Sequence, residues 1–244
     1  LIIYTTFMAS FASTTSNTKP IEINIPSLSN QDRGKFWNLE SNTIFLVCDG
    51  HGKYGDKYAE LMVQYIESII STIDWDQDDL TDTIETLFEN MENTAISKLS
   101  DISGGTTVSF GIRRKGRDIW IANLGDSNIV LFDKSNDKYR ILSDDHTPTN
   151  IAEFKRIIND FPNTVFEYDK QFRYGSIIPV YKKIFGEFQL VPPPETNVYY
   201  KNVEGEFATY VSDGESLKLA MTRTIGDFLY KEKLGVSKIP YINK

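Results

Sequence analysis

Hydrophobic positions change their spacing along the chain, from a helical repeat to short runs, near residue 106. Apolar residues recur every three or four positions over 58–73, which predicts an amphipathic helix. The same spacing over 80–99 predicts a second helix, which begins after the acidic turn at 74–79, where aspartates suit the positive end of the helix dipole. The unbroken apolar run at 44–48 predicts a buried strand ahead of both helices.

From residue 106 onward, short apolar runs alternate with turn residues. They predict strands at 106–112, 118–123, 128–132 and 139–142. Because connections of a few residues cannot make a parallel crossover, we expect an antiparallel β-meander with Asp126 at the tip of a tight hairpin. Two amphipathic helices followed by such strands indicate the α+β class.

The remaining segments carry weaker patterns. A short helix is predicted at 150–159. Residues 160–215 have no sustained period and contain three consecutive prolines, so we interpret them as an insertion or flap with some strand content. A strand, a Gly-Asp turn and a short helix are predicted within 216–240.

The first twenty residues differ in character from the rest of the chain. Residues 9–20 are rich in Ser and Thr without periodicity, which predicts a flexible leader over 1–20 and one folded domain over 21–244. The chain opens with Leu1, and its apolar start lacks the basic residues of a secretory signal. We therefore expect Met8 to be the true start. The apolar run is too short to span a bilayer, so no membrane association is expected.

Composition narrows the partners and the compartment. The net charge of −8, from 34 acidic and 26 basic residues, would repel a phosphate backbone, so nucleic acid is not an expected partner. Cys48 is the only cysteine and lies in the apolar run 44–48. No disulfide framework is possible, which favours a reducing, cytoplasmic location.

Candidate chemistry is concentrated where the first apolar run ends, in the sequence Asp49-Gly50-His51. A carboxylate on a rigid strand beside a bare glycine carbonyl offers the oxygen ligands that Mg²⁺ and Mn²⁺ prefer. His51 could transfer a proton, because the ordinary pKa of histidine lies near neutrality. An Asp-Gly pair is also an ordinary turn dipeptide, so these residues alone leave both interpretations open.

Four further turns follow in order: SGGTT at 103–107, LGDS at 124–127, DDHTP at 144–148 and TRTIGD at 222–227. Each has an ordinary structural explanation, such as a turn or a helix cap. Together with DGHG at 49–52, however, they resemble the successive motifs of the metal-dependent type 2C Ser/Thr protein phosphatases. The resemblance extends from about Ser29 to Pro240.

This resemblance implies a fold, a reaction and a set of roles. The implied fold is a four-layer α-β-β-α sandwich of two antiparallel sheets flanked by helices. The implied reaction is hydrolysis of phosphoserine or phosphothreonine in a phosphoprotein by water activated by Mn²⁺ or Mg²⁺ ions. Asp49 and Gly50 would be metal ligands, Asp126 would help to hold a further ion, and His51 would donate a proton to the leaving oxygen.

Several positions depart from the family pattern. Gln31 stands where the family has a metal-binding Glu, and Ser27 where several members have a phosphate-binding Arg. The family's C-terminal Asp-Gly and Asp-Asn metal ligands do not appear before Lys244, so we expect the sandwich to be incomplete at the C-terminus. A separate chain or a missing C-terminal segment could complete the site. The alternative is a catalytically impaired pseudophosphatase that binds a phosphoprotein or kinase; a phosphohydrolase for small molecules is a third possibility.

Overall fold

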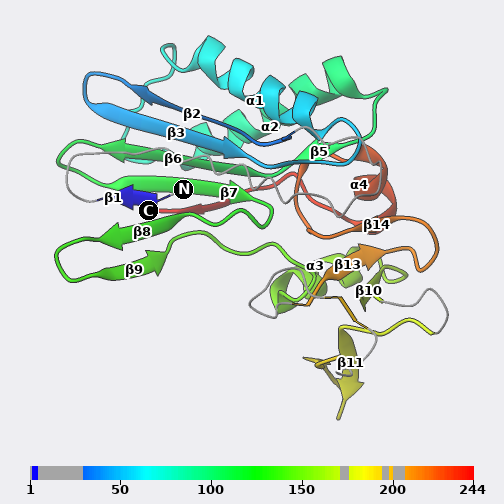
Figure 1. The fold of residues 1–244 in the computed structure, drawn as a ribbon. Coiled ribbons are helices and arrows are strands. Elements are labelled where there is room, and N and C mark those ends of the chain that lie inside the picture. The colour runs from blue at the N-terminus through cyan, green and yellow to red at the C-terminus, as the bar shows by residue number, and fades with distance from the viewer. Residues whose placement is uncertain (1, 5–29, 171–175, 194–197, 200–206) are drawn as a thin grey trace, which may run out of the picture.

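The computed structural model describes residues 2–4, 30–170, 176–193, 198–199 and 207–244 (Figure 1). Most of the predicted leader, including Met8, lies outside these residues, and so does Ser27. Residues Ile2–Tyr4 form strand β1, which pairs in parallel with β8 (Val130–Asp133).

The largest sheet has five antiparallel strands in the order β16-β7-β6-β3-β2. The strands are β2 (Arg33–Asn38), β3 (Asn42–Cys48), β6 (Val108–Arg114), β7 (Ile119–Leu124) and β16 (Tyr241–Asn243). The predicted strand at 44–48 is confirmed as part of β3. Ile44 and Leu46 of this strand are fully buried on the face that packs against the helices. Phe45 points to the opposite face, as the two-residue period of a strand requires.

Helices α1 (Gly55–Ile69) and α2 (Thr81–Leu99) cover one face of this sheet (Figure 1). Both predicted helices are confirmed, although α1 begins and ends a few residues earlier than the apolar repeat indicated. Met62 from α1 and Phe88 from α2 are completely buried in the main core. Apolar positions spaced by three and four residues thus produce one continuous layer between helices and sheet.

A second, three-stranded sheet lies on the other face and contains β1, β8 and β9 (Lys138–Ile141). A small apolar cluster joins the two sheets; its buried members are Phe45, Ile121, Ile129 and Leu142. The predicted meander is wrong at one step: β7 and β8 are not a hairpin, because they belong to different sheets. The chain crosses between sheets at Gly125, whose φ of +105° redirects the backbone, and Ile129 then enters the cluster.

A smaller region of the described chain surrounds a second core that includes Phe154, Phe166 and Val211. Its elements are α3 (Ile151–Asp160), β10 (Val165–Tyr168), β11 (Tyr181–Ile184), β12 (Glu187–Leu190), β13 (Thr209–Ser212), β14 (Lys218–Leu219) and α4 (Phe228–Leu234). Strands β10 to β13 supply the strand content expected within residues 160–215.

The predicted α+β class of antiparallel sheets with flanking helices is confirmed. None of the helices in the described part of the chain has the length and apolar character needed to cross a bilayer.

Candidate functional site

Three very short strands bring three of the sequence motifs together at one edge of the fold. Strands β4 (Gly50–His51), β5 (Gly105–Thr106) and β15 (Ile225–Gly226) form a sheet with β5 in the centre. His51 is paired with Gly105, which is in turn paired with Gly226. DGHG, SGGTT and TRTIGD, which are far apart in sequence, are therefore direct neighbours.

The other two motifs are hydrogen-bonded to this small sheet. The hydroxyl oxygens of Thr107 and Ser127 lie 2.7 Å apart, which ties LGDS to SGGTT. The backbone N–H of Gly125 donates to Nδ1 of His146 (3.1 Å), and the N–H of Thr222 donates to the carbonyl oxygen of His146 (2.8 Å). All five motifs thus belong to one hydrogen-bonded network.

His146 is the buried centre of that network. Its side chain is fully inaccessible, and burial together with the charge of Arg223 lowers the pKa of the imidazole to about 4. The ring is therefore neutral near pH 7, which allows Nδ1 to accept the bond from Gly125. His146 therefore has a structural role in the site.

Asp49 lies directly after β3 with its backbone fixed; the residue reaches the surface, although its carboxyl group is largely desolvated. Its carbonyl oxygen accepts bonds from the N–H of Thr107 (2.9 Å) and the hydroxyl of Thr106 (3.1 Å). Desolvation, then the adjacent carboxylates of Asp32 and Asp126, raise the pKa of Asp49 to about 6, while the charge of His51 acts in the opposite direction. The structure therefore brings Asp49, Asp126 and His51 together and adds Asp32.

Gly50 is buried in a place that admits no side chain. A Cβ at this position would lie 2.4 Å from the carbonyl oxygen of Gly55 and 2.7 Å from that of Gln31. The side-chain amide of Gln31 also donates to the carbonyl oxygen of Gly52 (2.9 Å). The turn after β3 is therefore packed tightly between the start of α1 and the segment before β2.

His51 makes its main contact with Asp227, for which the sequence pattern indicated no role beyond a turn. His51 Nε2 lies 2.6 Å from Asp227 Oδ2, and the side chain of Asp227 is only 3% exposed. Burial of the ring disfavours the imidazolium, but the hydrogen bond and charge of Asp227, with Asp49 and Asp126, outweigh it and raise the pKa of His51. Within the described part of the chain, Nδ1 of His51 has no hydrogen-bond partner.

Two buried glutamates hold the segment that carries Asp227. Glu92 of α2 accepts a bond from the N–H of Gly226 (3.1 Å) and pairs with Lys231 (2.5 Å). Glu153 of α3 pairs with Arg223 (2.6 Å). These contacts fix the backbone on both sides of Asp227, which adopts a left-handed conformation with φ of 48°.

The side chains at this edge supply some, but not all, of the oxygen ligands that a hard divalent cation needs. Asp32, Asp49 and Asp126 are carboxylates, and the pKa of Asp49 is raised first by desolvation and then by the charges of Asp32 and Asp126, a repulsion that a cation would reduce. Among the described residues, however, no group of three or more His, Cys, Asp or Glu is arranged to hold an ion unaided. The residues present therefore fit an ion whose remaining ligands are water or other oxygens.

Comparison with known proteins gives consistent matches. The family model described as protein phosphatase 2C matches residues 11–168. Probable protein phosphatase 2C 17 of Arabidopsis thaliana is 31% identical over 220 residues, which cover 87% of this chain and 69% of that protein. Probable protein phosphatase 2C 10 of Arabidopsis thaliana is 30% identical over 100 residues, which cover 40% of this chain and 35% of that protein.

Among solved structures, that of a C. elegans sex determining protein aligns with a TM-score of 0.52 at 18% identity. The alignment covers 88% of this chain and 45% of that one, and it concerns the fold alone. The chain thus spans less than half of this structural neighbour.

Proposed function

Because this chain belongs to the protein phosphatase 2C family, we propose that it is a metal-dependent phosphatase that hydrolyses phosphoserine and phosphothreonine in proteins. The observation that supports this most is the single network that joins all five motifs around Asp49 and His51. The folded domain over 21–244 would be the catalytic domain, with 160–215 as a flap that influences substrate choice.

Asp49 and Gly50 would hold Mn²⁺ or Mg²⁺, and Asp126 would help to hold a further ion. When bound, such ions supply a water molecule that loses its proton near neutral pH and attacks phosphorus. Asp32 adds a carboxylate beside Asp49. Further oxygen ligands could come from a separate chain or from an additional C-terminal segment.

His51 would donate the proton that the departing serine or threonine oxygen requires. Asp227 accepts the hydrogen bond from Nε2 and stabilises the imidazolium. Nδ1 is buried and has no hydrogen-bond partner within the described part of the chain, so a shift of the ring or of the groups around it would have to expose its proton to the leaving oxygen. Because the charge of Asp227 favours the protonated ring, His51 would carry this proton at neutral pH more often than a free imidazole does.

The alternative is a pseudophosphatase that binds a phosphoprotein or kinase without hydrolysing it. The neutral side chain of Gln31 and the absence, in the described residues, of a complete acidic metal cluster favour this alternative. Retention of Asp49 and His51 favours the enzyme.

One experiment separates the two functions. The purified chain is incubated with a phosphothreonine peptide and Mn²⁺, beside Asp49→Asn, His51→Gln and the control Asp137→Asn, which removes an exposed charge in the β8–β9 turn. Asp49→Asn should weaken Mn²⁺ binding, measured by calorimetry, and abolish turnover. His51→Gln should retain Mn²⁺ binding and lower kcat about 10²- to 10⁴-fold.

Asp137→Asn should behave as the parent protein does. Absence of turnover in the parent protein at saturating Mn²⁺ would overturn the proposed activity, and phosphopeptide binding without turnover would establish the alternative.

A further inference from the structure

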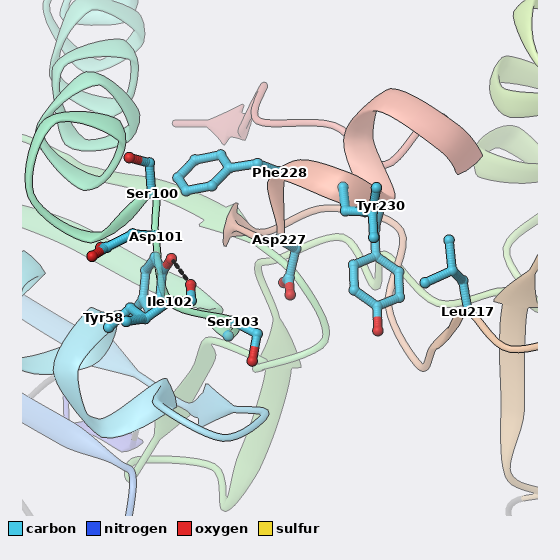
Figure 2. A pocket seen from close by; sticks show the side chains of 11 residues that line it. Tyr58, Ser100, Asp101, Ile102, Ser103, Leu217, Asp227, Phe228 and Tyr230 are labelled. Atoms are coloured by element: carbon cyan, nitrogen blue, oxygen red, sulfur yellow. Dashed lines mark hydrogen bonds between the residues drawn. The ribbon is translucent and has the colours of Figure 1, made fainter.

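A pocket of about 290 Å³ lies beside Asp227, on the side of the short α4 helix (Figure 2). It is formed by the loop after α2, the start of α4, Tyr58 from α1 and Leu217 from the segment before β14. The side chains that give the pocket its chemical character are those of Asp101, Ser103, Leu217, Asp227, Phe228 and Tyr230. The proposed metal ligands and the proton donor lie outside its lining.

The pocket is directly connected to the candidate site. Asp227 lines it and also accepts the hydrogen bond from His51. Ser103 and Gly104 line it as well, and they begin the SGGTT motif that supplies β5. Consecutive Cα atoms are about 3.8 Å apart, so a peptide whose phosphorylated residue lies at His51 would bring a neighbouring residue to the pocket.

Its size suits one side chain. A volume of about 290 Å³ is at the lower limit of sites for drug-sized molecules, which begin at about 300 Å³. Figure 2 shows the Asp227 carboxylate and the Tyr230 hydroxyl directed to the same side, with the ring of Phe228 above. An apolar stem could contact Leu217 and the rings while its polar end meets the Tyr230 hydroxyl, close to the negative charge of the almost fully buried Asp227.

The electrostatic environment of the pocket is negative. Burial raises the pKa of Tyr58 to about 12 and also raises the pKa of Tyr230. After burial, every further cause is a carboxylate: Asp227, Glu92 and Asp101 for Tyr58, and Asp227 and Asp213 for Tyr230. Lys231 has its Nζ 5.7 Å from the Phe228 ring centre, but this ammonium is paired with Glu92 and does not line the pocket.

We propose that this pocket binds the lysine or arginine side chain of a residue next to the phosphorylated serine or threonine, and so selects basic phosphorylation sites. The proposal rests on the proposed phosphatase function. A cation over an aromatic face is favoured by about 0.5 to 2 kcal/mol, which corresponds to about a 2- to 30-fold preference for a basic over a neutral residue.

The test uses phosphothreonine peptides that carry Lys, Ala or Glu at each of the two positions before and after the phosphothreonine. Values of kcat/KM with Mn²⁺ are compared with turnover of p-nitrophenyl phosphate, which has no neighbouring residues. At one position Lys should exceed Ala and Ala should exceed Glu. Asp101→Asn and Tyr230→Leu should each reduce this preference at least twofold, with p-nitrophenyl phosphate turnover unchanged.

The control is Asp137→Asn, which removes the same charge at the far end of the β8–β9 hairpin and should preserve the preference. Asp101 is exposed, so its variant should fold even if Tyr230→Leu does not. Equal kcat/KM values for the Lys and Glu peptides, with hydrolysis intact, would refute the proposed role of the pocket but not the phosphatase function.

Absence of hydrolysis on every substrate would instead overturn the function. Fluorescence anisotropy with the unhydrolysed peptides then tests the pocket separately. Tighter binding of the Lys peptide than of the Glu peptide, weakened in Asp101→Asn, would support the pocket, and equal dissociation constants would refute it.

Discussion

Replacement of Glu153 by glutamine should strongly destabilise the segment that leads to Asp227. Glu153 is 1% exposed. It accepts bonds from Arg223 (2.6 Å), Arg156 (2.8 Å) and the hydroxyl of Thr222 (2.8 Å). The variant keeps the shape of the side chain but leaves two guanidinium groups without their shared carboxylate.

The magnitude can be obtained from the pKa of this carboxyl group. Burial acts to raise it, but Arg223 and Arg156 prevail and lower the pKa of Glu153 from 4.5 to about 2. This lowering of the pKa corresponds to about 3 kcal/mol of folding free energy. Loss of one partner from a buried ion pair typically costs about 3 to 5 kcal/mol, which agrees with this value.

Because the folded-state pKa is lowered, this stabilisation is fully present above pH 4.5 and is lost as the pH falls towards 2. Urea unfolding of both proteins should therefore give a difference of about 3 kcal/mol at pH 7 and about half of that near pH 3. Since the charge of Glu153 also affects His146, the pair should be compared again in a His146→Gln background. A difference below about 1 kcal/mol, or one that does not change with pH, would refute this reasoning.

Three further predictions concern the network itself. Asp227→Asn should lower kcat at least tenfold with little change in KM, because His51 loses the charge that stabilises its imidazolium. Steady-state kinetics on p-nitrophenyl phosphate measure this effect. An unchanged kcat would contradict a role for the His51–Asp227 pair in catalysis. Gly105→Ala should lower both kcat and the urea midpoint of unfolding, because the new Cβ would lie 2.2 Å from Asp227 Oδ2 and 2.8 Å from the carbonyl oxygen of Ile225. A fully active variant with an unchanged midpoint would contradict this prediction. The lowered pKa of His146, about 4, means that the unfolded chain binds this proton more readily, so stability should fall between pH 6.5 and pH 4 by about 3 kcal/mol. His146→Gln should show a smaller fall over that range in urea unfolding, and an equal fall in both proteins would exclude His146 as the cause.

The sequence was most informative where side chains repeat with a fixed period. α1 and α2 each bury one apolar stripe, and β3 alternates between two faces. The spacing of apolar residues in these elements therefore indicates which side chains are buried. Strands β4, β5 and β15 have two residues each, which is too short for any period. The small sheet that assembles the candidate site therefore left no periodic signal in the sequence, although the motifs within it were recognised individually.

The crossing between sheets after β7 was missed for a related reason. A Gly-Asp pair between two apolar runs is typical of a hairpin. The local sequence does not show which distant groups will form hydrogen bonds with the residues of the turn. Here the hydroxyl of Ser109 donates to the carbonyl oxygen of Ser127 (2.5 Å), and His146 accepts from Gly125. Asp227 was overlooked in the same way, because its partner His51 is 176 positions away in sequence.

The contrast between the acidic groups of this protein separates structural from chemical roles. Three buried glutamates each have a cationic partner: Glu92 pairs with Lys231, Glu153 with Arg223 and Glu167 with Lys218.

Asp49 is different, since desolvation and then the charges of Asp32 and Asp126 raise its pKa, and His51 is the charged neighbour that acts in the opposite direction. A fold stabilised by burying paired charges gains nothing from gathering like charges at one sheet edge. A positively charged ligand at this edge would offset that cost, which supports the proposal that the metal site is at Asp49 rather than at the better-connected glutamates.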